Sequence, residues 1–365
     1  MYTSSLRWFT LKIRALSYHA PPSNSGETDY LPDLVFARSK SLFSNSGDLA
    51  WTNRVVLPRG PWAERSELVA EILDCVVRAG AGYLAVPVGV EHANAVPTLL
   101  SISDSVFVGV EVRQLQPEAA TGLAGLLYQI FEAQGSEALT RLALGLGGLV
   151  ETPYFPSTVS KREGISLSLL YVDDLRVVAQ PNSWRGLEKK IRGILAQAVE
   201  RGKRLAESSE LQFLGVDPSL SPWMDESVAK LVEDLTDGEF GSPGTFHAVA
   251  RLNSMISEAA GPKMVGFAEV MLPVAEDDRL KELTAEGSLR LRDLVGLSMV
   301  CVAGLDMVAL PASISVKGLA SVLVDTFTAA QVKGRSMGVR VLIVDGRPGD
   351  WVGLGRFGEV PVMEP

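Results

Sequence analysis

The chain has 365 residues, of which 47% are hydrophobic and 21% are charged, so it can bury a large core in one or two domains. Its formal net charge of −9 argues against general nucleic-acid binding, which needs Lys and Arg to replace the counterions on phosphates. The two cysteines and three histidines are scattered and form no zinc motif, and a disulfide framework is not expected in so large a core.

The amino-terminal stretch does not read as a signal peptide. Arg7, Lys12 and Arg14 interrupt its apolar residues, so it has no continuous apolar segment before a cleavage site. The longest uncharged apolar runs, such as residues 119–131, fall short of the roughly 20 residues that a membrane helix needs. We therefore expect a cytoplasmic protein with no membrane partner.

Hydrophobic periodicity predicts strands and helices that alternate along most of the chain. After a loop at 21–33, we expect a strand at 53–58, a helix at 63–79, a strand at 83–88, a helix at 93–102, a strand at 106–112, a helix at 117–135 and strands at 139–150 and 165–172. There follow a helix at 184–207, a strand at 213–216, helices at 225–235 and 245–259, a strand at 264–274, helices at 277–286 and 289–297, a strand at 299–310, a helix at 315–333 and a strand at 339–344.

This alternation indicates βαβ units and a mostly parallel sheet in one α/β domain spanning residues 1–365. Periodicity alone does not distinguish a closed barrel from an open doubly wound sheet, although the number of units favours a barrel. Residues 1–50 are expected to form either an amino-terminal extension or an edge element.

Several segments together resemble a known family. They are 213–245 (FLGVDPSLSPWMDESVAKLVEDLTDGEFGSPGT), 266–277 (GFAEVMLPVAED), 300–311 (VCVAGLDMVALP), 346–363 (GRPGDWVGLGRFGEVPVM) and, more weakly, 151–156 (ETPYFP). As a set they resemble the family called domain of unknown function 711, or uncharacterised protein family 0210. The resemblance implies a ten-stranded α/β barrel ringed by helices, like that of pyruvate formate-lyase and ribonucleotide reductase. It implies no particular reaction, because function is argued from a site rather than from a fold.

Cys301 is the residue that the resemblance singles out for chemistry. In the radical enzymes of that fold, a cysteine inside the barrel exchanges a hydrogen atom with the substrate. The carboxyl-terminal glycyl-radical motif is absent here, since the nearest stretch, 338–346, reads GVRVLIVDG. This chain also reads CVAGLD at 301–306, where family members typically read CGTGLD. We therefore predict that Cys301 is either a catalytic thiol or a small buried hydrophobic residue.

Three carboxylates, Asp217, Glu269 and Asp306, lie within apolar strands or at their ends. A buried carboxylate is costly unless it is paired or bound to a cation, and ligands collect at strand ends in α/β sheets. Asp217 and Asp306 are therefore catalytic candidates, and with Glu269 they form a candidate site for Mg²⁺ or Ca²⁺. The alternatives are a turn or cap role for Asp217 and structural ion pairs for the other two.

Four further residues are candidates for substrate binding. Arg54 and Arg340 are charges inside apolar strands, and we expect them either to hold an anionic substrate or to pair with the buried carboxylates. Ser219 lies close to Asp217. Thr245 ends a Gly-rich turn before a helix, where free N–H groups attract anions, and its alternative role is a helix cap.

These candidates favour an enzyme that acts on a small anionic metabolite in a site at the centre of the barrel, with a divalent metal ion as an optional cofactor. Two alternatives remain open: a non-catalytic metabolite-binding or regulatory protein, and a structural homo-oligomer. The expected partners are a small-molecule ligand and a second copy of the chain, with no nucleic acid.

Overall fold

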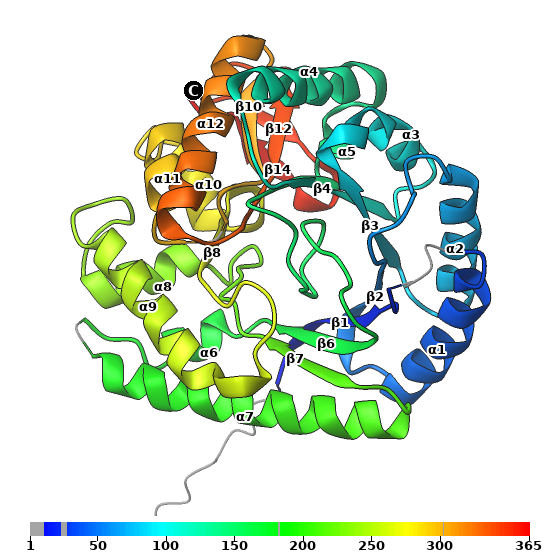
Figure 1. The fold of residues 1–365 in the computed structure, drawn as a ribbon. Coiled ribbons are helices and arrows are strands. Elements are labelled where there is room, and N and C mark those ends of the chain that lie inside the picture. Colours follow the sequence, from blue (N-terminus) through cyan, green and yellow to red (C-terminus); the bar gives the residue numbers. More distant parts are fainter. Residues whose placement is uncertain (1–10, 23–27, 182, 302) are drawn as a thin grey trace, which may run out of the picture.

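The computed structural model describes residues 11–22, 28–181, 183–301 and 303–365. An eight-stranded mixed sheet curls around the centre of the molecule in the order β11–β5–β4–β3–β2–β1–β6–β7 (Figure 1). Its strands are β1 (Ile13–His19), β2 (Ala50–Val56), β3 (Tyr83–Gly89), β4 (Val106–Val112), β5 (Leu142–Leu146), β6 (Gly164–Leu169), β7 (Phe213–Asp217) and β11 (Met337–Val339). Strands β1 to β5 are parallel, whereas β6 and β11 run antiparallel to their neighbours β1 and β5.

Six short strands form three separate pairs. They are β8 (Met271–Pro273) with β9 (Ala303–Asp306), β10 (Val308–Pro311) with β12 (Val341–Val344), and β13 (Trp351–Gly353) with β14 (Glu359–Pro361). In Figure 1, β8, β10 and β12 lie across the centre from β1 and β2.

The prediction of a closed ten-stranded barrel, which the resemblance implied, is therefore wrong. The main sheet has eight strands and forms a strongly curled half-barrel. Residues 264–274, which we expected to form one strand, show the physical reason. Within this range only Met271–Pro273 (β8) form a regular strand, while Gly266 and Ala268 have positive φ angles of 79° and 55°. The N–H groups of Phe267 and Ala268 bond to the carboxylate of Asp217, 3.0 and 3.1 Å away, instead of to a neighbouring strand.

Helices surround the strands in Figure 1. They are α1 (Leu31–Ser46), α2 (Ser66–Arg78), α3 (Val96–Ser101), α4 (Pro117–Gln134), α5 (Ser136–Leu139), α6 (Val172–Arg176), α7 (Trp184–Ser208), α8 (Val228–Thr236), α9 (Thr245–Ala260), α10 (Asp278–Ala285), α11 (Leu291–Leu297) and α12 (Val316–Lys333). Short 3₁₀ helices occur at η1 (Val90–Ala95), η2 (Gly261–Lys263), η3 (Val274–Glu276) and η4 (Gly355–Phe357). One cluster of buried hydrophobic residues runs from Leu11 to Met363 between the layers.

Most of the predicted helices and strands are confirmed, with ends that differ by a few residues. The region before residue 50 is the main exception, because it contains both β1 and α1. All seven residues of β1 are buried, and the strand lies between β2 and β6. This part of the chain therefore contributes an inner strand of the sheet.

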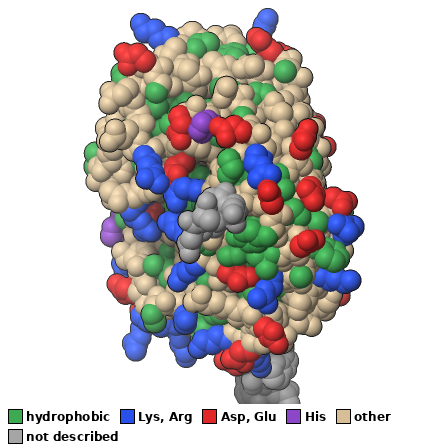
Figure 2. All heavy atoms as spheres, turned by 45° about the vertical axis from the view of Figure 1, so that its right-hand side comes forward, with side chains coloured by type: hydrophobic (Ala, Val, Ile, Leu, Met, Phe, Trp, Pro, Cys, Tyr) green, Lys and Arg blue, Asp and Glu red, His purple; other side chains and the backbone are tan. Residues whose placement is uncertain are grey.

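The surface carries charge unevenly. On the face shown in Figure 2, Lys and Arg side chains gather at the middle left and at the lower left, whereas many Asp and Glu side chains lie near the top and along the right edge. Among the described helices, none is both long and apolar enough to cross a bilayer.

Asp277 joins two helices through one buried carboxylate. It accepts hydrogen bonds from the N–H of Val228 (2.9 Å) at the start of α8 and from the N–H of Arg279 (3.1 Å) at the start of α10, and the hydroxyl of Ser227 also donates to it (2.6 Å). A carboxylate at a helix amino terminus satisfies free N–H groups and interacts favourably with the helix dipole. Burial nevertheless raises the pKa of Asp277 to about 6.

We predict that Asp277→Ala lowers the free energy of unfolding by about 2–4 kcal/mol, because the first turns of both helices lose their acceptor. Urea denaturation at pH 7 measures this change. Asp225→Ala, at an exposed position in the preceding loop, is the control and should change stability by less than about 0.5 kcal/mol. If both substitutions changed the unfolding free energy by the same small amount, Asp277 would not stabilise the starts of α8 and α10.

Candidate functional site

A cavity of about 290 Å³ lies inside the curled sheet. Seven aromatic side chains line it: Trp51, Tyr83, Phe107, Tyr154, Phe155, Trp223 and Phe267. Six charged side chains share the wall: Arg14, Arg54, Glu276, Asp306, Arg340 and Arg356. The volume is at the small end of the range for ligand pockets, and an apolar wall with a few polar groups is typical of them.

The cavity lies where amino and carboxyl ends of strands meet. Tyr83 and Phe107 lie at the amino ends of the parallel strands β3 and β4, whereas Asp306 is the last residue of β9. The loop between β5 and β6 adds Tyr154 and Ser157. Strand ends of opposite direction meet here because the sheet is mixed: β11, which contributes Gly338 to the cavity, runs antiparallel to β5.

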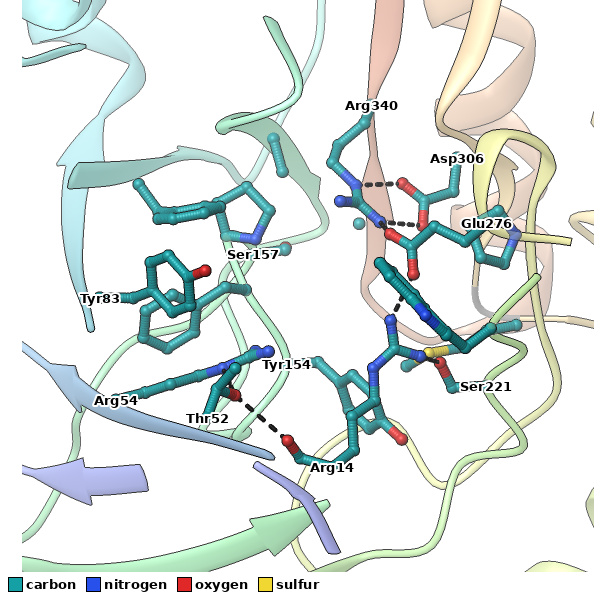
Figure 3. A pocket seen from close by; sticks show the side chains of 18 of the residues that line it. Arg14, Thr52, Arg54, Tyr83, Tyr154, Ser157, Ser221, Glu276, Asp306 and Arg340 are labelled. Carbon is teal, nitrogen blue, oxygen red and sulfur yellow. Dashed lines mark hydrogen bonds and ion pairs between the residues drawn. The ribbon is translucent and has the colours of Figure 1, made fainter. Parts of the chain in front are cut away.

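Four of the charged residues form a chain of ion pairs across the cavity wall (Figure 3). Arg14 Nη2 lies 2.5 Å from Glu276 Oε2, and Arg340 Nη2 lies 3.1 Å from Glu276 Oε1. Arg340 also holds Asp306 with two bonds, Nε to Oδ1 at 2.5 Å and Nη2 to Oδ2 at 2.7 Å. Burial alone would raise the pKa of Glu276, but the charges of Arg14 and Arg340 outweigh it and hold that pKa at about 2.

Arg54 is a half-buried cation on the opposite wall (Figure 3). Its Nε donates to Thr52 Oγ1 (2.9 Å), its Nη1 donates to the carbonyl of Pro153 (3.1 Å), and its guanidinium lies 5.1 Å from the ring centre of Phe155. None of the described carboxylates pairs with it. Burial, and then the positive charges of Arg14 and Arg356, lower the pKa of Arg54 to about 9.

Two more polar groups complete the wall. Arg356, on η4, is exposed, and its Nη1 donates to the hydroxyl of Tyr83 (3.1 Å). Ser157 is only 5% exposed, and its hydroxyl has no hydrogen-bond partner among the described residues. The remaining donors of Arg356 and the hydroxyl of Ser157 are groups that a bound molecule can contact.

Three of the predicted site residues, Arg54, Asp306 and Arg340, meet in this cavity. The pairing of Arg340 with Asp306 is one of the two roles that the sequence left open for both residues. Arg54 instead lacks the acidic partner that was its structural alternative.

Asp217 and Ser219 belong to a separate buried network. The carboxylate of Asp217 accepts from Thr152 Oγ1 (2.6 Å), from the Ser219 hydroxyl (2.6 Å) and from three backbone N–H groups. A Cβ atom at Gly266 would lie only 1.9 Å from Asp217 Oδ2, so the left-handed turn packs directly on this carboxylate. The arrangement matches the turn role that the sequence offered as the alternative to catalysis.

The remaining candidates also lie away from the cavity wall. Glu269 pairs with Lys333 and, at 2.6 Å, with Arg335. Cys301 is fully buried in the hydrophobic cluster. Thr245 is the buried first residue of α9 and accepts a hydrogen bond from the N–H of Gly241.

The three carboxylates considered for a metal ion are thus held by different donors. Asp217 bonds to hydroxyls and backbone N–H groups, Glu269 to Lys333 and Arg335, and Asp306 to Arg340. Within the described ranges, no group of three or more His, Cys, Asp or Glu side chains is arranged to hold a metal ion.

Sequence reasoning missed Arg14, Glu276 and Arg356. Arg14 carries the same signal as Arg54, a charge inside an otherwise apolar strand, but its region was not assigned to the sheet. Glu276 lies within the family-like segment 266–277, yet nothing in the sequence distinguishes it from its acidic neighbours. Arg356 lies in a Gly-rich tail whose path the sequence does not predict.

A family model described as "Uncharacterised ACR (DUF711)" matches residues 94–354. This chain belongs to that family. The matched range supplies Glu276, Asp306 and Arg340, whereas Arg14, Arg54 and Arg356 lie outside it. The cavity is therefore built from both parts of the chain.

The chain is also similar to curated relatives over part of its length. It is 34% identical over 170 residues to a UPF0210 protein of Desulforudis audaxviator, 32% over 170 residues to one of Pyrobaculum arsenaticum and 33% over 170 residues to one of Methanopyrus kandleri. Each match covers 45% of this chain and 38% of the relative. The chain thus spans well under half the length of these relatives.

We predict a pH-dependent effect of Glu276→Gln. The pKa of Glu276 is lowered from 4.5 to about 2 in the folded protein, so its contribution to stability is complete above pH 4.5 and is lost as the pH falls toward 2. The variant should lose about 3 kcal/mol of unfolding free energy at pH 7, and about half of that at pH 3.

Denaturant titrations of both proteins at several pH values between 3 and 7 measure this difference. Glu118→Gln, at an exposed position in the first turn of α4, is the control and should show a smaller difference than Glu276→Gln at pH 7. A loss for Glu276→Gln that stays equally large at pH 3 would show that the ion pairs do not lower the pKa of this carboxylate.

Proposed function

We propose that the protein binds a small organic anion in the cavity and that Arg54 holds its negative charge. The observation that carries this proposal is the half-buried guanidinium of Arg54, which faces the cavity without an acidic partner in the described chain. A charge removed from water is costly unless another charge compensates it. A bound carboxylate or phosphate would supply that compensation through charge-assisted hydrogen bonds.

The neighbouring carboxylates are already engaged. Glu276 lies between Arg14 and Arg340, and Asp306 is held by two bonds from Arg340. The chain of ion pairs therefore leaves Arg54 available to a ligand. The aromatic wall around it fits the apolar part of an organic molecule.

The geometry supports binding more directly than catalysis. A general acid or base works best with a pKa near the pH of the reaction. Glu276 has a pKa of about 2, and burial raises the pKa of Tyr154 further above its ordinary value of 10.0. These shifts move both pKa values away from 7. Burial raises the pKa of the third acidic group, Asp306, but both of its oxygens are held by Arg340, and we therefore favour a metabolite-binding or regulatory protein over an enzyme.

We predict that Arg54→Met abolishes most of the anion binding. Isothermal titration with hexanoate, benzoate, glutarate and inorganic phosphate should detect a ligand for the unsubstituted protein. Loss of a charge-assisted contact should weaken that binding about 10- to 100-fold in the variant. Without ligand, the melting temperature of the variant should stay close to that of the unsubstituted protein, because the removed cation has no acidic partner.

Arg347→Met is the matched control, because Arg347 is exposed and does not line the cavity. It should bind the same anion with unchanged affinity. The proposal fails if no anion binds the unsubstituted protein, or if Arg54→Met binds it equally well.

A further inference from the structure

Two arginines flank one row of aromatic rings in the cavity wall. We infer that the ligand is a dicarboxylate: an organic molecule with two carboxylates separated by an apolar spacer, one held by Arg54 and the other by Arg356. This inference rests on the proposed anion binding and specifies the ligand class. It is carried by how the two guanidiniums are placed along the row.

The row consists of Tyr83, Phe107 and Phe155. The ring centres of Tyr83 and Phe107 lie 5.3 Å apart, and those of Phe107 and Phe155 lie 5.7 Å apart, both in edge-to-face contact. All three side chains line the cavity. They offer an apolar surface to the middle of a ligand.

The guanidiniums contact different rings of this row. Arg54 lies 5.1 Å from the ring centre of Phe155. Arg356 lies 5.6 Å from the ring centre of Tyr83 and 5.9 Å from that of Phe107. Since each arginine contacts its own part of the row, two separate anionic groups match them better than one group with both charges, such as a phosphate.

Both arginines keep donors available for a ligand. In the described contacts, Arg54 uses its Nε and one Nη1 bond, and Arg356 uses one Nη1 bond to the hydroxyl of Tyr83. A guanidinium has five N–H donors. The Nη2 groups of both residues thus remain for a carboxylate.

The charges of the wall lead to the same conclusion. Among the described residues, four arginines and two carboxylates line the cavity, which leaves a formal excess of two positive charges. The Arg14–Glu276–Arg340–Asp306 chain is balanced within itself, so the excess belongs to Arg54 and Arg356. A dicarboxylate carries the two negative charges that neutralise it.

The different exposure of the two arginines also fits a ligand with two carboxylates. Arg356 is exposed, as is Trp51, which is 54% exposed and lines the cavity. Arg54 is half-buried and lies next to the backbone of Pro153. A ligand can therefore place one carboxylate inside while the other remains near solvent.

The test is a titration series. The affinities of straight-chain dicarboxylates from succinate to suberate are compared with those of monocarboxylates of the same carbon number, in the unsubstituted protein and in Arg356→Met. The unsubstituted protein should bind a dicarboxylate of one preferred length about tenfold or more tightly than the matching monocarboxylate. Arg356→Met should lose this preference and keep its monocarboxylate affinity, whereas Arg347→Met should keep both.

The results that would contradict the dicarboxylate inference differ from the result that would contradict anion binding itself. Equal affinity for both series, or an equal loss of both in Arg356→Met, overturns the inference while leaving Arg54-dependent anion binding intact. Tighter binding of phenyl phosphate than of every dicarboxylate also overturns it, because both charges then sit on one group. If neither series nor phenyl phosphate binds the unsubstituted protein, the proposed function itself fails.

Discussion

The buried chain Arg14–Glu276–Arg340–Asp306 is the interaction on which the rest of the structure depends. It joins β1, the first strand of the described chain, to η3, to the end of β9 and to the residue between β11 and β12. These elements are distant in sequence and come from the curled sheet and from the short pairs opposite it. Breaking a buried pair leaves an uncompensated charge, at a typical cost of about 3–5 kcal/mol. The alternating charges therefore hold the two sides of the half-barrel around a cavity.

This arrangement also determines what the cavity can bind. The balanced chain uses the acidic side chains of the wall and leaves Arg54 and Arg356 unpaired among the described residues. The aromatic residues beside the half-buried Arg54 lower the local dielectric and so strengthen its electrostatic contacts. Asp217 supports the same wall from behind, since it holds the backbone of Phe267, which lines the cavity. The polar interior is thus divided between groups that maintain the fold and groups that face a ligand.

Much of the fold could be predicted from the sequence, because long periodic segments such as 117–135 and 184–207 have a strong helical pattern. The open edge of the half-barrel could not be predicted, because residues 264–274 look like one strand by composition, whereas the N–H groups of Phe267 and Ala268 bond to Asp217 instead of to a neighbouring strand. For the candidate site, the rule that a charge within an apolar strand marks a functional residue predicted Arg54 and Arg340, and both side chains line the cavity. The same reasoning, that a buried charge is costly, also predicted Asp217 and Glu269 as site residues. In the structure both lie away from the cavity: hydroxyls and backbone N–H groups bond to Asp217, and Lys333 pairs with Glu269. Sequence shows that a buried charge needs a partner, but only the fold shows which partner it has.

A crystal structure of the protein soaked with glutarate or a longer dicarboxylate tests the central claim most directly. The account predicts a carboxylate within hydrogen-bond distance of Arg54 Nη2, inside the cavity and against the aromatic row, with the ion pairs of Glu276 and Asp306 unchanged. It is contradicted if the anion binds elsewhere on the protein, or if the guanidinium of Arg54 pairs with a carboxylate of the protein itself.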